Sequence, residues 1–158
     1  MRRKDREVTD FDKIREILDG CKTCRLAMVD NGQPYVVPLN YAYELDDGAL
    51  TLYFHSAKDG RKIRILRENG AVCFEISSEG EPIRAENDPC NSGYYYACVH
   101  GFGDARFIDE AGEKCAALTL LTKHQSGIDA EFTARQADGV CVFKVLSADY
   151  TCKVKPKD

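Results

Sequence analysis

The sequence predicts a mainly β fold, an antiparallel barrel with helices packed against its outside. Strand-like segments follow one another through tight turns, which is typical of antiparallel sheets. Strands and helices do not alternate regularly, which argues against a doubly wound parallel sheet. We therefore expect one domain over residues 1–158, with flexible ends at residues 1–8 and 153–158.

The first half of the chain contains a well-marked helix and three strands. Thr9 can cap the helix, with Asp12 in the reciprocal position of a capping box, and Gly20 ends it. Strands are expected over 25–29, 35–43 and 49–54. Asn31-Gly32 is a strong signal for a two-residue hairpin turn. Pro38 indicates a bulge, an edge or a local break in pairing.

The rest of the chain should add three more helices and the rest of the sheet. We expect a helix over 59–68, a strand over 71–76, a loop over 77–93, a strand over 93–108, a helix over 109–123, a short helix from 133 and a strand over 140–145. Asp109 can cap the long helix, and Thr133 with Gln136 forms a capping box for the short one. A basic tail follows the last strand, and the loop over 77–93 could be a lid or a partner contact.

Charge and hydropathy exclude several classes of protein. The net charge is −4, whereas a sequence-independent nucleic-acid binder needs a surplus of cations. No apolar stretch follows the basic residues 1–6, so we expect no secretory signal. No apolar run is long enough to span a bilayer. We therefore expect a cytoplasmic protein without nucleic-acid or membrane partners.

The eight cysteines are expected to be reduced, mostly buried thiols, because they lie mainly in apolar strand-like segments. Cys21 and Cys24 have a spacing found in redox pairs and in halves of zinc sites. No second such pair exists and the βαβ context of redox motifs is missing, so we favour a structural role. The histidines at 55, 100 and 124 show no metal-ligand spacing, and we expect no metal site.

The segment most informative about chemistry is residues 52–62, where a strand gives way to a helix. Arg61 and Lys62 stand in the first turn of that helix, where cations oppose the helix dipole. A bound phosphate would relieve this conflict, and Ser56 could donate a further hydrogen bond. The alternative is that both cations are solvated surface residues. His55 is either a hydrogen-bonded structural residue or a ligand contact.

Two further segments could contact a flat ring. The broken strand over residues 36–43 exposes backbone N–H and C=O groups that can pair with the edge of a heteroaromatic ring such as isoalloxazine. The alternative is an ordinary edge strand protected by Pro38. Residues 94–96 are three consecutive tyrosines that could stack on a flavin or close a dimer interface, and we favour the interface.

Four short motifs occur in a characteristic order. They are Val-Pro-Leu-Asn-Tyr at 37–41, Leu-Tyr-Phe-His-Ser-Ala at 52–57, Gly-Arg-Lys at 60–62, and Tyr-Tyr-Tyr-Ala-Cys-Val-His-Gly-Phe-Gly-Asp-Ala at 94–105. Together they resemble the pyridoxamine 5′-phosphate oxidase-like flavoproteins, and in particular the branch related to nitroimidazole-resistance proteins. Residues 3–11 and 121–125 also match that branch, so the resemblance spans roughly residues 3–150.

This resemblance implies an antiparallel split β-barrel that forms a homodimer with FMN at the subunit interface. The matching positions are Pro38, Leu39, Asn40 and Tyr41 along the flavin ring, His55, Ser56 and Ala57 beside the ring and ribityl chain, Arg61 and Lys62 at the phosphate, and Val99, Gly101, Lys123, His124 and Gln125 at the border of the cleft. Some of the last group could come from the partner subunit. His55 is the candidate catalytic residue, as a proton donor or acceptor near the substrate.

Two kinds of function follow from the resemblance. The first is an FMN-dependent oxidoreductase that passes electrons to a small oxidised substrate such as a nitroaromatic compound. The second is a non-catalytic carrier or sensor of flavin or haem on the same barrel. Haem would need an axial ligand, for which His55, His100 and His124 are candidates.

Overall fold

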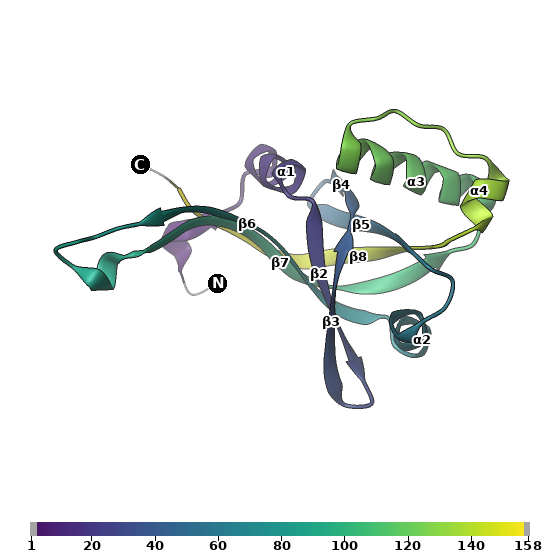
Figure 1. The fold of residues 1–158 in the computed structure, drawn as a ribbon, viewed down its shortest axis with the longest axis horizontal. Coiled ribbons are helices and arrows are strands. Elements are labelled where there is room, and N and C mark those ends of the chain that lie inside the picture. The colour runs from purple at the N-terminus through teal and green to yellow at the C-terminus, as the bar shows by residue number, and fades with distance from the viewer. Residues whose placement is uncertain (1–2, 157–158) are drawn as a thin grey trace.

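The computed structural model describes residues 3–156 and contains one antiparallel sheet with helices around it (Figure 1). The strands are β1 (Glu7–Val8), β2 (Thr23–Asp30), β3 (Gln33–Asn40), β4 (Ala42–Asp46), β5 (Ala49–Ser56), β6 (Ala71–Ile83), β7 (Gly93–Ile108) and β8 (Cys141–Lys155). The helices are α1 (Phe11–Gly20), α2 (Arg61–Glu68), α3 (Ala111–Ser126) and α4 (Ala134–Asp138), with short 3₁₀ turns η1 (Lys4–Arg6) and η2 (Pro89–Asn91). This confirms the mainly β fold with peripheral helices.

The sheet is strongly curved but not closed. Its strand order is β3-β2-β6-β7-β8-β5-β4, and β1 pairs with β8. Strand β3 is therefore an edge strand, which explains how it accommodates Pro38, a residue that cannot donate a backbone hydrogen bond. In the part of the chain that the structure describes, no helix is long and apolar enough to cross a membrane.

Two apolar clusters hold the fold together. The larger one fills the concave side of the sheet and includes the inward faces of α1 and α2, whose apolar residues recur at helical spacing. The smaller cluster packs α3 and α4 against the ends of β5 and β8 and contains Leu118, Leu121, Ala137 and Val142. Helix α3 is thus a separate layer over one edge of the sheet, and the space beside it becomes the candidate site.

Two of the expected helix caps were wrong by one residue. Asp10, not Thr9, caps α1, because its carboxylate accepts a hydrogen bond of 3.0 Å from the N–H of Lys13. Glu110, not Asp109, caps α3. In both cases two neighbouring residues can cap, and only the direction in which the chain enters the helix selects between them. The capping box of Thr133 and Gln136 is confirmed.

The expected loop over residues 77–93 was wrong over much of its length. Strand β6 continues to Ile83, and it forms with the start of β7 a long hairpin that projects from the body (Figure 1). Likewise β8 runs to Lys155 instead of ending at 145, and β1 pairs with it. Residues 7–8 and 153–155, expected to be flexible, therefore lie in strands. These polar segments become strands because the long β7 provides a pairing partner.

Candidate functional site

A pocket of about 380 Å³ lies between the sheet and the α3–α4 layer. It is lined by Asn40, His55, Leu118, Leu121, Thr122, Gln125, Ser126, Phe132, Gln136 and Val140. Three of the residues carried over from the family resemblance meet here: Asn40 from the end of β3, His55 from the end of β5 and Gln125 from the last turn of α3. These positions are far apart in the sequence, so the fold alone brings them together.

Hydrogen bonds fix the two amide side chains on one wall of the pocket. The Asn40 amide donates to Oε1 of Gln125 at 2.8 Å and to the Lys22 carbonyl at 3.1 Å. The Gln125 amide donates to the carbonyls of Tyr41 at 2.7 Å and Lys22 at 3.1 Å. The end of α3 is thereby tied to the start of β2 and the end of β3, and both amides are oriented before any ligand binds.

His55 lines the pocket, and Lys62 is close enough for its charge to act on His55. The surrounding protein lowers the pKa of the exposed His55 imidazole, and the nearby charge of Lys62 lowers it further. Burial also lowers the pKa of Lys62, which is partly buried. Among residues 3–156 no carboxylate forms an ion pair with Lys62. This cation therefore lacks a counter-charge within the described chain.

The start of α2 beside Lys62 has the properties of an anion site. Gly60 precedes the helix with φ 131°, and no side chain caps the first turn. The first turn also contains no acidic residue, so its N–H groups and partial positive charge remain available. An uncapped helix start next to a partly buried, unpaired lysine fits the phosphate of a nucleotide cofactor.

Arg61, the other cation expected at the phosphate, is engaged elsewhere. Its Nε donates to Asp30 at 2.7 Å, and its guanidinium lies 4.3 Å from the ring centre of Tyr35. Arg64 donates to the same carboxylate at 2.8 Å. These contacts attach the β2–β3 hairpin to α2. Asp30 is the last residue of β2, next to the hairpin turn, and shows no sequence signal of this role.

Replacing Asp30 by asparagine should destabilise the protein in a pH-dependent manner. Hydrogen bonds from Arg64 and Arg61 hold the Asp30 pKa below its ordinary value of 3.8. A lowered pKa stabilises the fold fully above the ordinary value, and this contribution is lost as the pH falls through the folded-state pKa. Urea unfolding should therefore show a deficit for Asp30→Asn at pH 7 that shrinks in strong acid. A deficit of equal size at both ends of the pH range would contradict this origin, and Asp129→Asn is a surface control.

Several other residues carried over from the resemblance lie outside the pocket. Tyr41 is fully buried, and its hydroxyl donates to the Leu18 carbonyl at 2.7 Å. Val99 and Gly101 are buried within β7. A Cβ on Gly101 would lie 2.5 Å from Cβ of Tyr150, so close strand packing accounts for this glycine. The structure does not bring these residues to the pocket of their own chain.

The neighbours of Gln125 face a different groove. Lys123 forms an ion pair with Asp129 at 2.6 Å. A ring nitrogen of His124 lies 3.1 Å from the Cys21 carbonyl, and the ring centre lies 4.8 Å from that of Tyr41. Burial lowers the pKa of His124, with a smaller effect from a neighbouring cation. Of the three consecutive residues 123–125, one lines the pocket and two do not.

The remaining expected positions lie along the strand edges near the pocket. Pro38 is exposed on edge strand β3, and Leu39 is partly buried there. Ser56 ends β5, and its hydroxyl donates to the carbonyl of Ala57 at 2.8 Å. The structure therefore places Ser56 and Ala57 between His55 and α2, and their expected contact with a ribityl chain stays a prediction.

The wall formed by α3 and α4 was not expected from the sequence. Its residues Leu118, Leu121, Phe132 and Val140 read as ordinary core positions, and Thr122 and Gln136 as ordinary helix residues. No motif marks them, because their role depends only on how α3 packs over the sheet. The resulting wall is mostly apolar, with amide and hydroxyl groups at its edge.

The open antiparallel sheet with helices around it and a pocket at its edge defines a protein of the split-barrel class. The family model described as pyridoxamine 5′-phosphate oxidase matches residues 10–149. The chain therefore belongs to the pyridoxamine 5′-phosphate oxidase family. A comparison with curated proteins found no match.

Solved structures agree with this assignment. A proposed 5-nitroimidazole antibiotic resistance protein from Bacteroides thetaiotaomicron is 30% identical, with a TM-score of 0.80 over 94% of this chain and 86% of that one. The flavocytochrome Anf3 from Azotobacter vinelandii is 21% identical, with a TM-score of 0.78 over 95% of this chain and 69% of that one. The FAD and haem binding protein from Mycobacterium smegmatis is 17% identical, with a TM-score of 0.78 over 97% and 76%. The last two share the fold.

Proposed function

We propose that this protein is an FMN-dependent oxidoreductase that acts on a small oxidised substrate, with nitroaromatic compounds as the favoured class. One observation carries the proposal: the pocket formed by Asn40, His55 and Gln125 has beside His55 the cation Lys62, which forms no ion pair among residues 3–156 and stands in the uncapped first turn of α2. The 30% identity to a proposed 5-nitroimidazole antibiotic resistance protein supports the substrate class. We further propose a cytoplasmic homodimer in which the second subunit completes the cofactor site.

Each part of the pocket has a distinct task in this proposal. Bound FMN supplies the electron-transfer chemistry. Lys62 and the first N–H groups of α2 bind the phosphate. The amides of Asn40 and Gln125, already held by hydrogen bonds, orient the polar edge of the ring. The apolar side chains of α3 and Phe132 exclude water from the reacting face.

His55 is suited to proton transfer because its pKa is lowered. Its imidazole is therefore neutral at pH 7 and can accept a proton through one nitrogen while donating through the other. A substrate that gains electrons must also gain protons, and His55 is the titratable side chain that lines the pocket. In this proposal it is the proton donor or acceptor at the substrate.

Identifying the bound chromophore tests the cofactor. Protein purified without added cofactor should release FMN, recognised by its mass and by a yellow absorption spectrum near one flavin per chain. Release of FAD would contradict the single-phosphate site. A Soret band would favour the alternative, a haem-handling protein, which two structural neighbours make worth testing.

A His55→Ala variant should retain its flavin but react slowly with the substrate. Proton transfer by a positioned side chain typically contributes about 100-fold or more in rate. We expect a loss of about that size in the rate at which a nitroaromatic compound reoxidises the reduced protein, measured by stopped-flow absorbance. His124→Ala, a histidine that does not line the pocket, is the matched control. An unchanged rate in His55→Ala would assign this histidine a structural role.

A further inference from the structure

We propose that the β6–β7 hairpin arm of one copy docks on helix α2 of a second copy. The arm is defined as residues 79–96, which include the outer parts of β6 and β7 and the turn η2. The inference deepens the homodimer proposed above by naming the two surfaces that meet. It rests on that homodimer and is independent of which cofactor binds.

One face of the sheet is open to a partner. The register places Val36, Ala27, Cys73 and Phe102 side by side across β3, β2, β6 and β7. Side chains alternate along a strand. Phe74, next to Cys73, lies in the larger apolar cluster, and a Cβ on Gly101, next to Phe102, would point toward the same cluster. The row therefore lies on the face away from the core, where Val36 and Phe102 are 55% and 54% exposed. An apolar row on an uncovered sheet is typical of a contact surface.

The arm extends this open face away from the body (Figure 1). At its base, Arg6 donates to the Tyr96 hydroxyl at 3.0 Å, and Lys155 on β8 pairs with the same residue. Beyond this point, in the described part of the chain, β6 and β7 pair only with each other, and Tyr94 is 60% exposed. A two-stranded ribbon is marginally stable in water by itself. We therefore expect the arm to be held by another surface.

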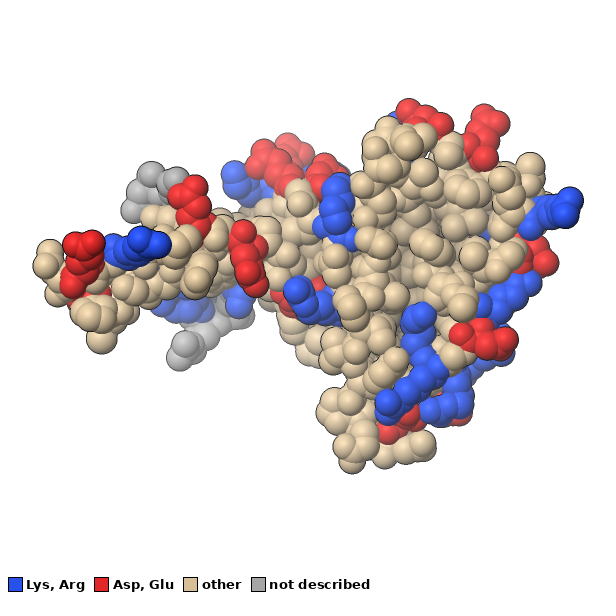
Figure 2. Space-filling model, viewed as in Figure 1, with Lys and Arg blue, Asp and Glu red and all other residues tan. Residues whose placement is uncertain are grey.

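The arm and α2 carry opposite charge. Residues 79–93 contain four acidic residues and one arginine, a net charge of −3. Residues 61–68 of α2 contain four basic residues and one glutamate, a net charge of +3. Arg61 and Arg64 share the carboxylate of Asp30, so Arg67 is the cation of α2 that we expect to meet the arm. Red groups mark the arm in Figure 2, and blue groups gather around α2 at the other end of the molecule. Such complementarity favours association between copies and sets its orientation.

A groove on the outer side of α2 can receive the acidic arm. It measures about 310 Å³ and is lined by Asp59, Gly60, Ile63, Arg64, Arg67 and Glu68. Arg67 has no carboxylate partner among the ion pairs of residues 3–156 and lies over the Phe107 ring at 5.7 Å. Lys62 does not line this groove and lies near His55, so the arm would contact the side of α2 that carries Arg67.

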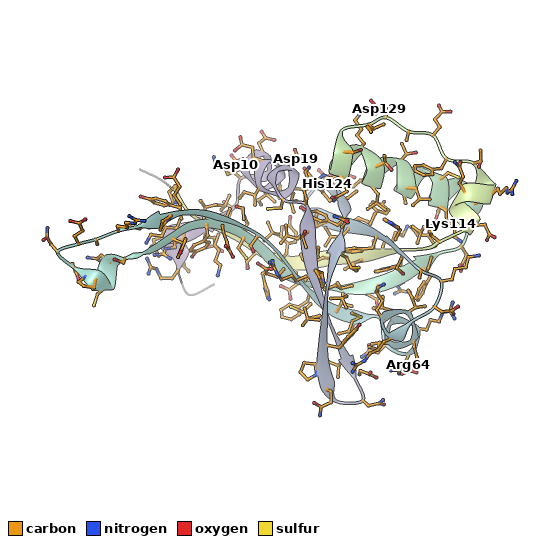
Figure 3. The ribbon with its side chains drawn as sticks, viewed as in Figure 1. Asp10, Asp19, Arg64, Lys114, His124 and Asp129 are labelled. Carbon is orange, nitrogen blue, oxygen red and sulfur yellow. The ribbon has the colours of Figure 1, made fainter. Side chains whose placement is uncertain are left out.

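The arm cannot reach α2 of its own chain, because the two lie at opposite ends of the sheet (Figures 1 and 3). Two copies that meet through their open faces around a twofold axis bring each arm to the α2 of the other. The contact is reciprocal, as twofold symmetry requires. Both copies of each surface are used within the pair, so the contact limits assembly to a dimer.

Disulfide trapping tests the contact directly. Cys90 is an exposed thiol in η2 near the tip of the arm. An Arg67→Cys variant under mild oxidation should form a covalent dimer on non-reducing gels, and adding Cys90→Ser should abolish it. Ile128→Cys, exposed on the loop after α3, is the matched control. The proposal would be overturned if Arg67→Cys formed no more covalent dimer than Ile128→Cys.

Charge exchange provides a second test that needs no oxidation. The double variant Glu79→Lys, Glu86→Lys should weaken the dimer about tenfold in sedimentation velocity, and Arg67→Glu in the same chain should recover part of that loss. Additive weakening without recovery would overturn the contact. FMN content, measured in parallel, separates the arm contact from the proposed FMN-dependent function. A dimer without FMN would support the arm contact and contradict the cofactor, and a monomer with FMN would refute the arm contact.

Discussion

A Lys62→Ala variant is expected to bind FMN about 10- to 100-fold more weakly than the wild type. A hydrogen bond to a charged group contributes about 1.5–3 kcal/mol, and every 1.4 kcal/mol is a tenfold change in affinity. Lys62 is partly buried and forms no ion pair within the described chain. The neighbouring cation Arg61 is bound to Asp30, so we do not expect it to replace Lys62. Titration of apoprotein with FMN, followed by quenching of flavin fluorescence, measures the effect.

Riboflavin distinguishes a phosphate contact from general damage to the pocket. It has the same ring and ribityl chain as FMN but no phosphate, so its affinity should be nearly the same in the wild type and in Lys62→Ala. Lys123→Ala, whose lysine is paired with Asp129 away from the pocket, should leave both affinities unchanged. If Lys62→Ala lost riboflavin and FMN affinity equally, Lys62 would not be the phosphate ligand.

A Gly101→Ala variant is expected to lose about 3 kcal/mol of stability, at the upper end of the usual cost of overpacking. A Cβ at this position would lie 2.5 Å from Cβ of Tyr150 and 2.7 Å from the carbonyl oxygen of Asp149. Both atoms belong to the paired strand β8, which cannot move without breaking the ladder. Urea unfolding followed by circular dichroism gives the difference in free energy.

Gly20→Ala is the matched control, because nothing lies within 4 Å of a Cβ there. It should leave stability unchanged or raise it slightly. The same pair of variants examines the resemblance-based role of Gly101 at the cofactor cleft. If Gly101→Ala folded with wild-type stability but lost flavin, the glycine would serve the cofactor, including that of a partner subunit, and not strand packing.

Much of the fold could be predicted from local patterns in the sequence. The Asn31-Gly32 turn, the edge position of Pro38 and the capping box at Thr133 depend on interactions within a few residues. The outer arm and the end of β8 could not, because their polar residues have no intrinsic preference for a strand. They become strands through pairing with β7, which is a long-range interaction.

The candidate site shows the same division. The strand end at His55 and the cations that begin α2 are neighbours in the sequence, and a resemblance located them. Lys62 and Arg61 are adjacent, yet Arg61 turns to Asp30 on a distant hairpin and Lys62 does not. Similarly, Gln125 lines the pocket while His124 packs against tyrosines. A helix turns by about 100° per residue, so neighbours face different partners.

The sequence by itself determined the class of this protein: an antiparallel sheet with peripheral helices, and a strand–helix junction that begins with two cations. Tertiary structure alone decided which side chains share the pocket and that Arg61 forms an ion pair with Asp30. It also decided that one face of the sheet is left exposed in the single chain. The reason is physical. Turns, caps and periodicity depend on neighbours along the chain, whereas pockets, ion pairs and open surfaces depend on which elements pack together.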